Sequence, residues 1–476
     1  MKTTSPFLPR CNHLPATSRK TAPETGAEGR LERAASGPAV TSEFLHRPLF
    51  YGKNDAKTGY DLIEDVLAVS AHIEDFDHVI NDCADRYFFT VLLLAGAIRN
   101  KINLLPANRT ESSINALIER YHSTVLVTDE LEQTDGRAMQ ISGMLAPAEK
   151  PPPQAARAIP RIAHDQVIAI AYTSGSTGEP HAHPRTWRWA MQEALAAGLA
   201  LGLDKNRPRR IICTTPPQHM YGFVSSVLMP LVLGQTSFRG RPFFPEEIRE
   251  ALSASGSESL LVTTPTQIRA CIRSNARLPQ PELILSSAAP LDRKMAERAE
   301  KTYLTRVVEF YGSTETGAIA IRQPVAEQSW ETFRGVRVTS VNNELEVRAD
   351  YLPGPVLVQD QVDIIDSRHF LLLGRSADLI KIGGKRESLA RLNQTLLAME
   401  GVEDGAFFVP ETIGDREPRL AAVVVAPGLS VKDILSHLSH SIDAVFLPRP
   451  LKIVDALPRT TTGKLTRKAL LALLKK

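Results

Sequence analysis

The sequence predicts a large α/β domain of layered sheets and helices, followed by a small α+β domain. Between residues 44 and 375, short β-branched runs alternate with segments apolar enough to be buried helices, as in layered α/β proteins. After residue 375 the pattern changes to a shorter alternation of strands and helices. A chain of 476 residues also exceeds what one hydrophobic core usually holds.

We therefore expect a disordered tail over residues 1–43, a large N-terminal domain over 44–375 and a small mobile domain over 376–476. The first segment mixes Pro, Ser, Thr, Ala, Arg and Glu without a hydrophobic period and lacks the apolar centre of a secretory signal. It is either a tail or an upstream start site.

Periodicity and cap residues place the individual elements. In the large domain we expect strands at residues 78–81, 123–128, 167–171, 210–214, 259–262, 282–285 and 306–309, helices at 85–99, near 110–120 and at 187–203, and a β-rich segment over 336–373. In the small domain we expect strands at 379–382, 405–409, 420–425 and near 451–454, with helices at 389–399, 431–442 and from 466 onward.

The segment at residues 172–180, with the sequence YTSGSTGEP, follows an apolar strand and has the make-up of a phosphate-binding loop. Small residues let backbone N–H groups close around an anion, and hydroxyls add donors without bulk. The spacing differs from Walker A, because no Lys follows Gly178. The alternative is an ordinary Ser/Gly loop.

Bulk properties exclude several function classes. The net charge of +3 and the absence of a basic block argue against nucleic acid as a partner. The four cysteines form no C-x-x-C pair, so neither a zinc site nor a disulfide framework is indicated, and a cytoplasmic location is expected. The longest apolar stretches are too short or interrupted to span a membrane.

Four motifs occur in order along the chain. They are the loop at 172–180, YGSTE at 311–315, Asp360 standing 15 residues before Arg375, and PRTTTGKL at 458–465. This set resembles the adenylate-forming superfamily, which contains acyl-CoA synthetases, luciferases and the adenylation domains of peptide synthetases. The resemblance covers the chain from about residue 44 to its end.

The resemblance implies an ATP-dependent ligase that turns a carboxylic acid into an acyl-adenylate and then transfers the acyl group to a thiol. It implies ATP and Mg²⁺ as cofactors. The residues that would bind them are Thr173, Ser174, Gly175, Ser176, Thr177 and Gly178 for the phosphates, Ser287, Ala288, Ala289, Tyr311, Gly312, Ser313 and Thr314 around the nucleotide, Asp360 and Arg375 at the ribose, and Glu315 with Thr177 for the metal.

Each assignment has a structural alternative: Glu315 as a surface carboxylate, Tyr311 as a core tyrosine and Asp360 as a turn residue. Lys464, which follows Thr-Gly in the last motif, matches the mobile lysine that bridges the carboxylate and the phosphate during adenylation. We expect Lys464, His219 and Glu315 to be catalytic.

The acid is expected to be aromatic. The segment 216–222, with the sequence PPQHMYG, resembles the Pro-x-x-His motif of aryl and acyl-CoA ligases and lacks the Asp that pairs the amine of an amino acid. His219, Tyr221 and Gly312 would then contact the acid. The alternative is that His219 and Tyr221 are satisfied within the core.

A narrower resemblance connects the chain to compact ligases of aryl polyene and xanthomonadin-type pigment pathways, which load an aromatic acid onto an acyl carrier protein. It rests on CADRYF at 83–88, LLPANR at 104–109, PRTW at 184–187, and Gly374-Arg375 with KIGGKR at 381–386. The thiol acceptor implied is an acyl carrier protein or coenzyme A. The acid, the choice of acceptor and the oligomeric state stay open.

Two positions depart from the superfamily pattern. His181 replaces the lysine that commonly follows the glycine loop, so that positive charge would come from His183 or Arg185. Ala377 replaces the Asp or Lys of the hinge. These departures make a second reading conceivable, a catalytically silent adenylate-binding sensor or scaffold, against which the presence of Glu315 and Lys464 argues.

Overall fold

The computed structural model describes residues 4–6, 45–106, 109–130, 138–145, 159–173, 181–256, 258–342, 344–375, 379–382, 385–410, 419–459 and 465–475. The chain divides into two compact units. Unit 1 is Met1–Val262 with Arg277–Glu282, and unit 2 is Thr263–Ala276 with Leu283–Lys476. The expected joint near residue 376 stays a prediction, because residues 376–378 lie outside the described part of the chain.

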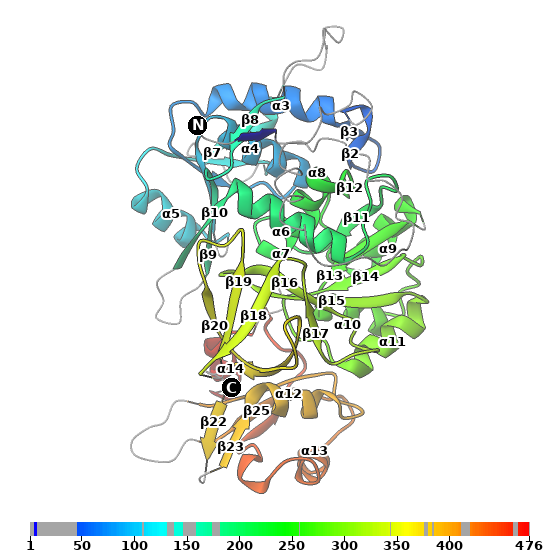
Figure 1. Ribbon diagram of the computed structural model, residues 1–476. Coiled ribbons are helices and arrows are strands. Elements are labelled where there is room, and N and C mark those ends of the chain that lie inside the picture. The colour runs from blue at the N-terminus through cyan, green and yellow to red at the C-terminus, as the bar shows by residue number, and fades with distance from the viewer. Residues whose placement is uncertain are drawn as a thin grey trace, which may run out of the picture. The chain divides into compact units, whose positions relative to one another are not determined.

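Unit 1 contains a six-stranded sheet in the order β10-β9-β5-β4-β6-β7 (Figure 1, blue to green). All neighbours pair in parallel except β10, which runs antiparallel to β9. Its strands are β4 (His78–Asn81), β5 (Ile102–Leu105), β6 (Thr124–Thr128), β7 (Ala138–Gln140), β9 (Val167–Thr173) and β10 (His181–Thr186).

A second set of strands in unit 1 has the order β3-β2-β12-β11-β13. These strands are β2 (Pro48–Tyr51), β3 (Ala56–Thr58), β11 (Arg210–Cys213), β12 (Thr236–Phe238) and β13 (Ser259–Thr263). The helices of unit 1 are α3 (Gly59–His72), α4 (Arg86–Ile98), α5 (Glu111–Arg120), α6 (Trp187–Ala200), α7 (Met220–Gly222), α8 (Met229–Leu233) and α9 (Pro245–Ser255), with a 3-10 turn at Ile141–Met144 and a π-helical turn at Phe223–Leu228. The short strand β1 (Thr4–Pro6), within the expected tail, pairs with β8 (Arg161–Ala163).

Side-chain caps determine where several of these helices begin. The side chains of Thr58, Asp85, Thr110 and Thr186 each accept a hydrogen bond from a backbone N–H in the first turn of α3, α4, α5 and α6. Such a cap satisfies one of the N–H groups that have no partner within the helix.

Unit 2 begins with helix α10 and the parallel pair β14 and β15, and continues in antiparallel strands in the order β15-β16-β17-β21-β20-β19-β18. The elements up to the glycine-arginine pair are α10 (Pro265–Arg273), β14 (Leu283–Ser286), α11 (Arg293–Tyr303), β15 (Arg306–Ser313), β16 (Gly317–Arg322), β17 (Trp330–Thr332), β18 (Val336–Val341), β19 (Glu344–Ala349), β20 (Val356–Ile364) and β21 (His369–Arg375).

The last hundred residues of unit 2 form the expected α+β pattern. Their elements are β22 (Leu379–Ile382), β23 (Lys385–Ser388), α12 (Leu389–Leu397), β24 (Asp404–Phe408), β25 (Ala421–Val425), α13 (Val431–Ser439), a 3-10 turn at Ala444–Phe446, β26 (Leu451–Ile453) and α14 (Arg467–Lys475). Successive residues of β24 point to opposite faces of the sheet. Phe407 packs in the cluster that contains Leu392 and Ile434, whereas Phe408 packs in the cluster that contains Leu470. The sheet is therefore buried on both faces.

Most predicted elements are confirmed within one to three residues at each end. Strand β15 continues beyond residue 309 through Tyr311 to Ser313, because that segment pairs with β16 across a bulge at Tyr311/Gly312. Several elements were not predicted, among them strands β10, β16, β17 and β23 and helices α3 and α9. Within the described residues, no helix is both long enough and apolar enough to cross a bilayer.

A buried ion pair connects two strands of unit 2. Glu309 on β15 is 2% exposed and receives hydrogen bonds from the Arg322 guanidinium and from the backbone N–H of Leu291. Burial raises the pKa of Glu309, although Arg322 opposes the shift. The Arg322 guanidinium also lies 4.4 Å from the centre of the Trp330 ring.

We predict that Arg322→Ala lowers the free energy of unfolding by about 3–5 kcal/mol, because it leaves the Glu309 carboxylate buried without its cation. A raised folded-state pKa means that the folded protein takes up a proton, so the stability of the variant should fall as the pH rises. The loss should therefore be smaller near about pH 5 than near about pH 8. Chemical denaturation at both pH values measures it.

The matched control is Arg348→Ala, since Arg348 pairs with Glu346 on the surface and is itself 59% exposed. An exposed ion pair contributes little to stability. Equal losses in the two variants, or a loss in Arg322→Ala that does not depend on pH, would contradict the assignment.

Candidate active site

The glycine-rich loop connects two paired strands of unit 1. Residues 174–180 lie outside the described residues, but the strands on either side of them, β9 and β10, are antiparallel and Thr173 pairs directly with His181. The Thr173 hydroxyl and Nε2 of His183 are 3.0 Å apart, within hydrogen-bond distance. The ends of the loop are thus held by a β-ladder and by one side-chain contact.

His183 and Arg185, the two residues expected to supply positive charge beside this loop, differ in their surroundings. His183 is half-buried next to Thr173, whereas Arg185 is only 1% exposed and its guanidinium lies 3.7 Å from the centre of the Trp189 ring. His181, at the position of the usual lysine, is exposed. Of these three residues, His183 is therefore the one whose side chain contacts Thr173, the residue just before the loop.

The residues of unit 2 that were expected to bind the nucleotide lie on β15 and β20 and just after β14. The Tyr311 phenol donates a hydrogen bond of 2.5 Å to Oδ2 of Asp360. The Tyr311 ring packs against Trp330 and Phe370, with ring centres 5.4 and 5.6 Å apart. Tyr311 as a whole residue is nevertheless half-buried rather than fully buried.

The spacing of 15 residues between Asp360 and Arg375 follows from an antiparallel pair. Asp360 on β20 is directly paired with Arg375 on β21. The backbone of the two residues is thereby adjacent, and Asp360 is 7% exposed. The contacts of Trp330 and Phe370 with the tyrosine ring were not predicted, because an aromatic residue that supports a site has the same sequence pattern as one in an ordinary core.

The small residues after β14 form a bend beside this tyrosine. The Ser287 hydroxyl donates to the backbone carbonyl of Phe310, one residue before Tyr311. Ala288 has a φ of 72°, in the left-handed region that costs a non-glycine residue about 1–2 kcal/mol. Strain of this kind is concentrated at functional sites. Ser287, Ala288 and Ala289 are all partly accessible.

Glu315 lies on a tight turn between β15 and β16. The Ser313 hydroxyl accepts from the backbone N–H of Thr316, and the Thr316 hydroxyl accepts from the N–H of Ser313. This reciprocal pair closes the turn and leaves Glu315 exposed. Mg²⁺ is usually held by one or two carboxylates together with phosphate oxygens and water. A single exposed carboxylate beside hydroxyls fits such an ion.

The segment 216–222 of unit 1, which was expected to contact the acid, forms a turn and then a helix. Nδ1 of His219 caps α7 by accepting from the N–H of Tyr221. His219 is half-buried, whereas Tyr221 is only 8% exposed. Gly222 is required because a Cβ there would lie 2.2 Å from the carbonyl oxygen of Pro216. A π-helical turn follows, an irregularity that occurs frequently at functional sites.

Several expected site residues cannot be located. Residues Ser174–Gly178, Ala377 and Lys464 lie outside the described part of the chain, as does the side chain of Arg375. Among the described residues, no group of three or more His, Cys, Asp or Glu residues could hold a metal ion. The roles of these residues stay predictions.

Comparison with known proteins identifies the family. A family model described as AMP-binding enzyme matches residues 67–361. The chain belongs to the AMP-binding enzyme family. Its resemblance to adenylate-forming enzymes is thereby confirmed, and the match covers both the loop after β9 and Asp360 on β20.

Relatives of this AMP-binding enzyme include 4-coumarate–CoA ligase of Halorhodospira halophila, which is 30% identical over 305 residues, or 62% of this chain and 73% of the relative. Among solved structures, ATP-bound MatB from Rhodopseudomonas palustris has a TM-score of 0.77 at 19% identity, covering 91% of this chain and 98% of that one. The o-succinylbenzoate CoA synthetase of Bacillus subtilis, in complex with its acyl-adenylate, has a TM-score of 0.75 at 17% identity, covering 89% and 95%. These structures confirm the fold.

We predict that Gly312→Ala destabilises the protein by about 1–3 kcal/mol, since the new methyl group would overpack the turn. A Cβ at Gly312 would lie 2.1 Å from the carbonyl oxygen of Gly317 and 2.8 Å from Cα of Ala318, both on the paired strand. The free energy of unfolding measures the effect.

Gly354→Ala is the control, because a Cβ at that position meets no atom within 4 Å. It should change stability by less than about 0.5 kcal/mol. Equal effects of the two substitutions would contradict the prediction that β15 and β16 approach too closely at Gly312 to admit a Cβ.

Proposed function

We propose that this protein is an ATP-dependent acid–thiol ligase, which activates a carboxylic acid as an acyl-adenylate and transfers the acyl group to a thiol. The observation that carries the proposal is the hydrogen bond between Tyr311 and Asp360, with Asp360 paired to Arg375, in a chain of the AMP-binding enzyme family. The names of its relatives, which are CoA ligases, support the same reaction class.

In this proposal, Asp360 accepts hydrogen bonds from the ribose hydroxyls. One face of the Tyr311 ring would cover the adenine, and Ser287–Ala289 with Gly312–Thr314 would border the nucleotide. Because the phenol of Tyr311 already donates to Asp360, the carboxylate keeps its other lone pairs for the ribose. The same hydrogen bond holds the tyrosine ring at one orientation.

Thr173 and the hydroxyl and glycine residues 174–178 would bind the β- and γ-phosphates of ATP. Glu315 and Thr177 would hold Mg²⁺, which supplies positive charge against the phosphates when it is bound. With His181 at the position of the usual lysine, His183 would be the residue that interacts with the phosphates beside this loop. Its contact with Thr173 supports that role.

The chemistry takes place in two steps. A carboxylate oxygen of the acid attacks the α-phosphorus of ATP, the bond from that phosphorus to the bridging oxygen breaks, and pyrophosphate leaves. A thiol, having lost its proton, then attacks the acyl carbon, and AMP leaves with the electron pair of the C–O bond. Lys464 would stabilise the negative charge that develops in the first step.

The acid is proposed to be aromatic, with His219, Tyr221 and Gly312 on its side of the site. His219 is half-buried, which is compatible with direct contact to the acid. Tyr221 is only 8% exposed and would affect the acid mainly by supporting the residues that contact it. The thiol is proposed to be the phosphopantetheine of an acyl carrier protein or of coenzyme A. Resemblance to the pigment-pathway ligases favours the carrier.

The decisive experiment is ATP–pyrophosphate exchange with a panel of acids. We expect a benzoate or a cinnamate to drive exchange at least about tenfold better than palmitate, because one extra or missing contact in an apolar site changes rates by that order. Preference for palmitate would contradict the aromatic assignment. No exchange with any acid would favour a silent adenylate-binding protein instead.

We predict that Lys464→Ala slows acyl-adenylate formation by about 10²–10³-fold, the effect of losing one well-placed donor in a dry site. Thioester formation from supplied acyl-adenylate should stay within about tenfold of the parent, since the lysine acts on the phosphate chemistry alone. Single-turnover assays of the two half-reactions measure both. Lys468→Ala is the control, because this nearby lysine lies outside the motif; equal loss in both half-reactions would assign Lys464 to folding or docking.

A further inference from the structure

Arg86 is a fully buried arginine whose hydrogen bonds converge on the turn at residues 216–222 of unit 1. It is the first residue of α4, and its exposed fraction is 0%. Its Nη2 donates to the backbone carbonyls of Cys213 (2.5 Å) and Thr215 (2.7 Å), the residues that lead from β11 into the turn. Its Nη1 donates to the carbonyl of Gly240, just after β12.

The same guanidinium reaches the far end of the turn through a serine. Nε of Arg86 donates to the hydroxyl of Ser226 at 2.9 Å, and that hydroxyl donates to the carbonyl oxygen of Gly222 at 2.6 Å. One planar side chain therefore holds both the entry of the turn at Thr215 and its exit at Gly222. His219, the expected acid contact, lies between these two points.

The turn has little freedom once its ends are held. Its backbone is closed by bonds from the N–H of His219 to the carbonyl of Pro216 and from the N–H of Phe223 to that of His219. Gln218 adds bonds from Nε2 to the carbonyls of Asn81 and Cys83. The backbone just before Arg86 is thus hydrogen-bonded to Gln218, in the middle of the same turn.

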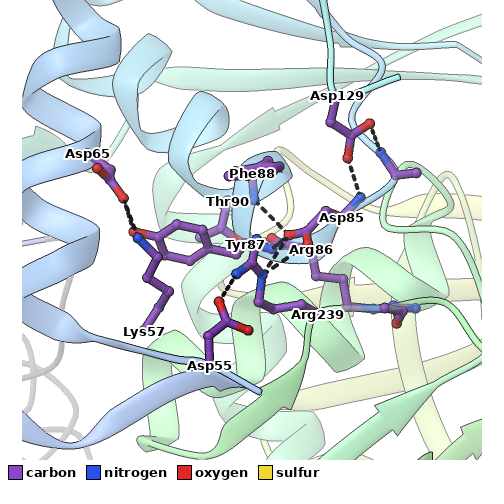
Figure 2. A network of polar contacts seen from close by, with 12 residues as sticks. Asp55, Lys57, Asp65, Asp85, Arg86, Tyr87, Phe88, Thr90, Asp129 and Arg239 are labelled. Atoms are coloured by element: carbon purple, nitrogen blue, oxygen red, sulfur yellow. Dashed lines mark hydrogen bonds and ion pairs between the residues drawn. The ribbon is translucent and has the colours of Figure 1, made fainter. Parts of the chain in front are cut away.

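Arg86 is itself held by a polar network around the start of α4 (Figure 2). Asp85 caps the helix by accepting from the N–H groups of Tyr87 and Phe88, and it pairs with Arg239 at 3.0 Å. The carboxylate of Asp129 accepts from the N–H groups of Ala84 and Asp85. The backbone N–H of Arg86 donates to the carbonyl of Arg239.

The location of Arg86 is unfavourable for a positive charge on two grounds. Burial of a guanidinium is costly, and the N-terminus of a helix repels cations. Among the described residues, its hydrogen-bond acceptors are three carbonyls and one hydroxyl, and no carboxylate forms an ion pair with it. A guanidinium offers a planar fork of N–H donors, and here that fork binds three backbone carbonyls and the Ser226 hydroxyl.

We infer that Arg86 is a positioning residue, which sets the place of the 216–222 turn and thereby the affinity and selectivity for the acid. The inference rests on the proposed function for its link to the acid, but the link from Arg86 to the turn rests on the hydrogen bonds alone. It gives a role to CADRYF, the motif at residues 83–88 that no expected contact with ATP explains.

The test uses Ser226, because replacing the buried Arg86 itself risks unfolding the protein. Ser226→Ala removes the connection from Arg86 to Gly222 while leaving the guanidinium in place. We expect the KM for the acid to rise about tenfold, as for a lost buried hydrogen bond, with kcat and the KM for ATP within about twofold of the parent. The ratio of kcat/KM between a good and a poor aromatic acid should fall.

Ser225→Ala is the matched control. Ser225 is the neighbouring residue on the same π-helical turn, is equally buried, and its hydroxyl has no hydrogen-bond partner among the residues that the structure describes. This variant should match the parent in every kinetic constant. Equal changes in Ser225→Ala and Ser226→Ala, or an equal loss of acid and ATP parameters in Ser226→Ala, would overturn the inference.

A second readout needs no catalysis. Amide hydrogen exchange of the peptide that spans residues 214–223 should be about tenfold faster in Ser226→Ala than in the parent or in Ser225→Ala. If the parent activates no acid at all, the proposed function is wrong, and this measurement alone decides whether Arg86 positions the turn. Unchanged exchange in Ser226→Ala would overturn the positioning role whatever the activity.

Discussion

The hydrogen bond from the Tyr311 phenol to Asp360 joins two motifs that stand 49 residues apart in the chain. Each partner depends on its own strand pair: Tyr311 on the bulged pairing of β15 with β16, and Asp360 on the pairing of β20 with β21. Aromatic packing by Trp330 and Phe370 fixes the tyrosine ring between them. The meeting of Tyr311 and Asp360 thus depends on sheet register, since a one-residue slip would turn either side chain to the opposite face.

Much of this could be predicted from the sequence, because local patterns encode it. Caps such as Asp85 and Thr110 mark helix starts correctly, and the motifs at 311–315 and at Asp360 point to residues that the fold does bring together. The strand β10 was missed because its sequence, HAHPRT, has no apolar alternation. It is a strand because β9 supplies a partner, which is a tertiary effect on a weak local preference.

The role of Arg86 could not be predicted for a different reason. Its partners are backbone carbonyls at residues 213, 215 and 240, and a backbone carbonyl has no signature in a sequence. A motif search detects the arginine but not what it holds. Likewise, the sequence offered Arg185 as a cation near the glycine-rich loop, and only the structure shows it buried against Trp189.

The direct pairing of Thr173 with His181 has a consequence for how this family member can vary. Pairing of the two strands meets the entropic cost of closing the connection between them, and that cost depends on the number of residues in the connection. Substitutions among the seven residues between these two positions that keep their number therefore leave this closure cost unchanged. The departure at His181 lies on the paired strand β10 and not within the connection, so it is constrained by the strand pairing as well as by any ligand.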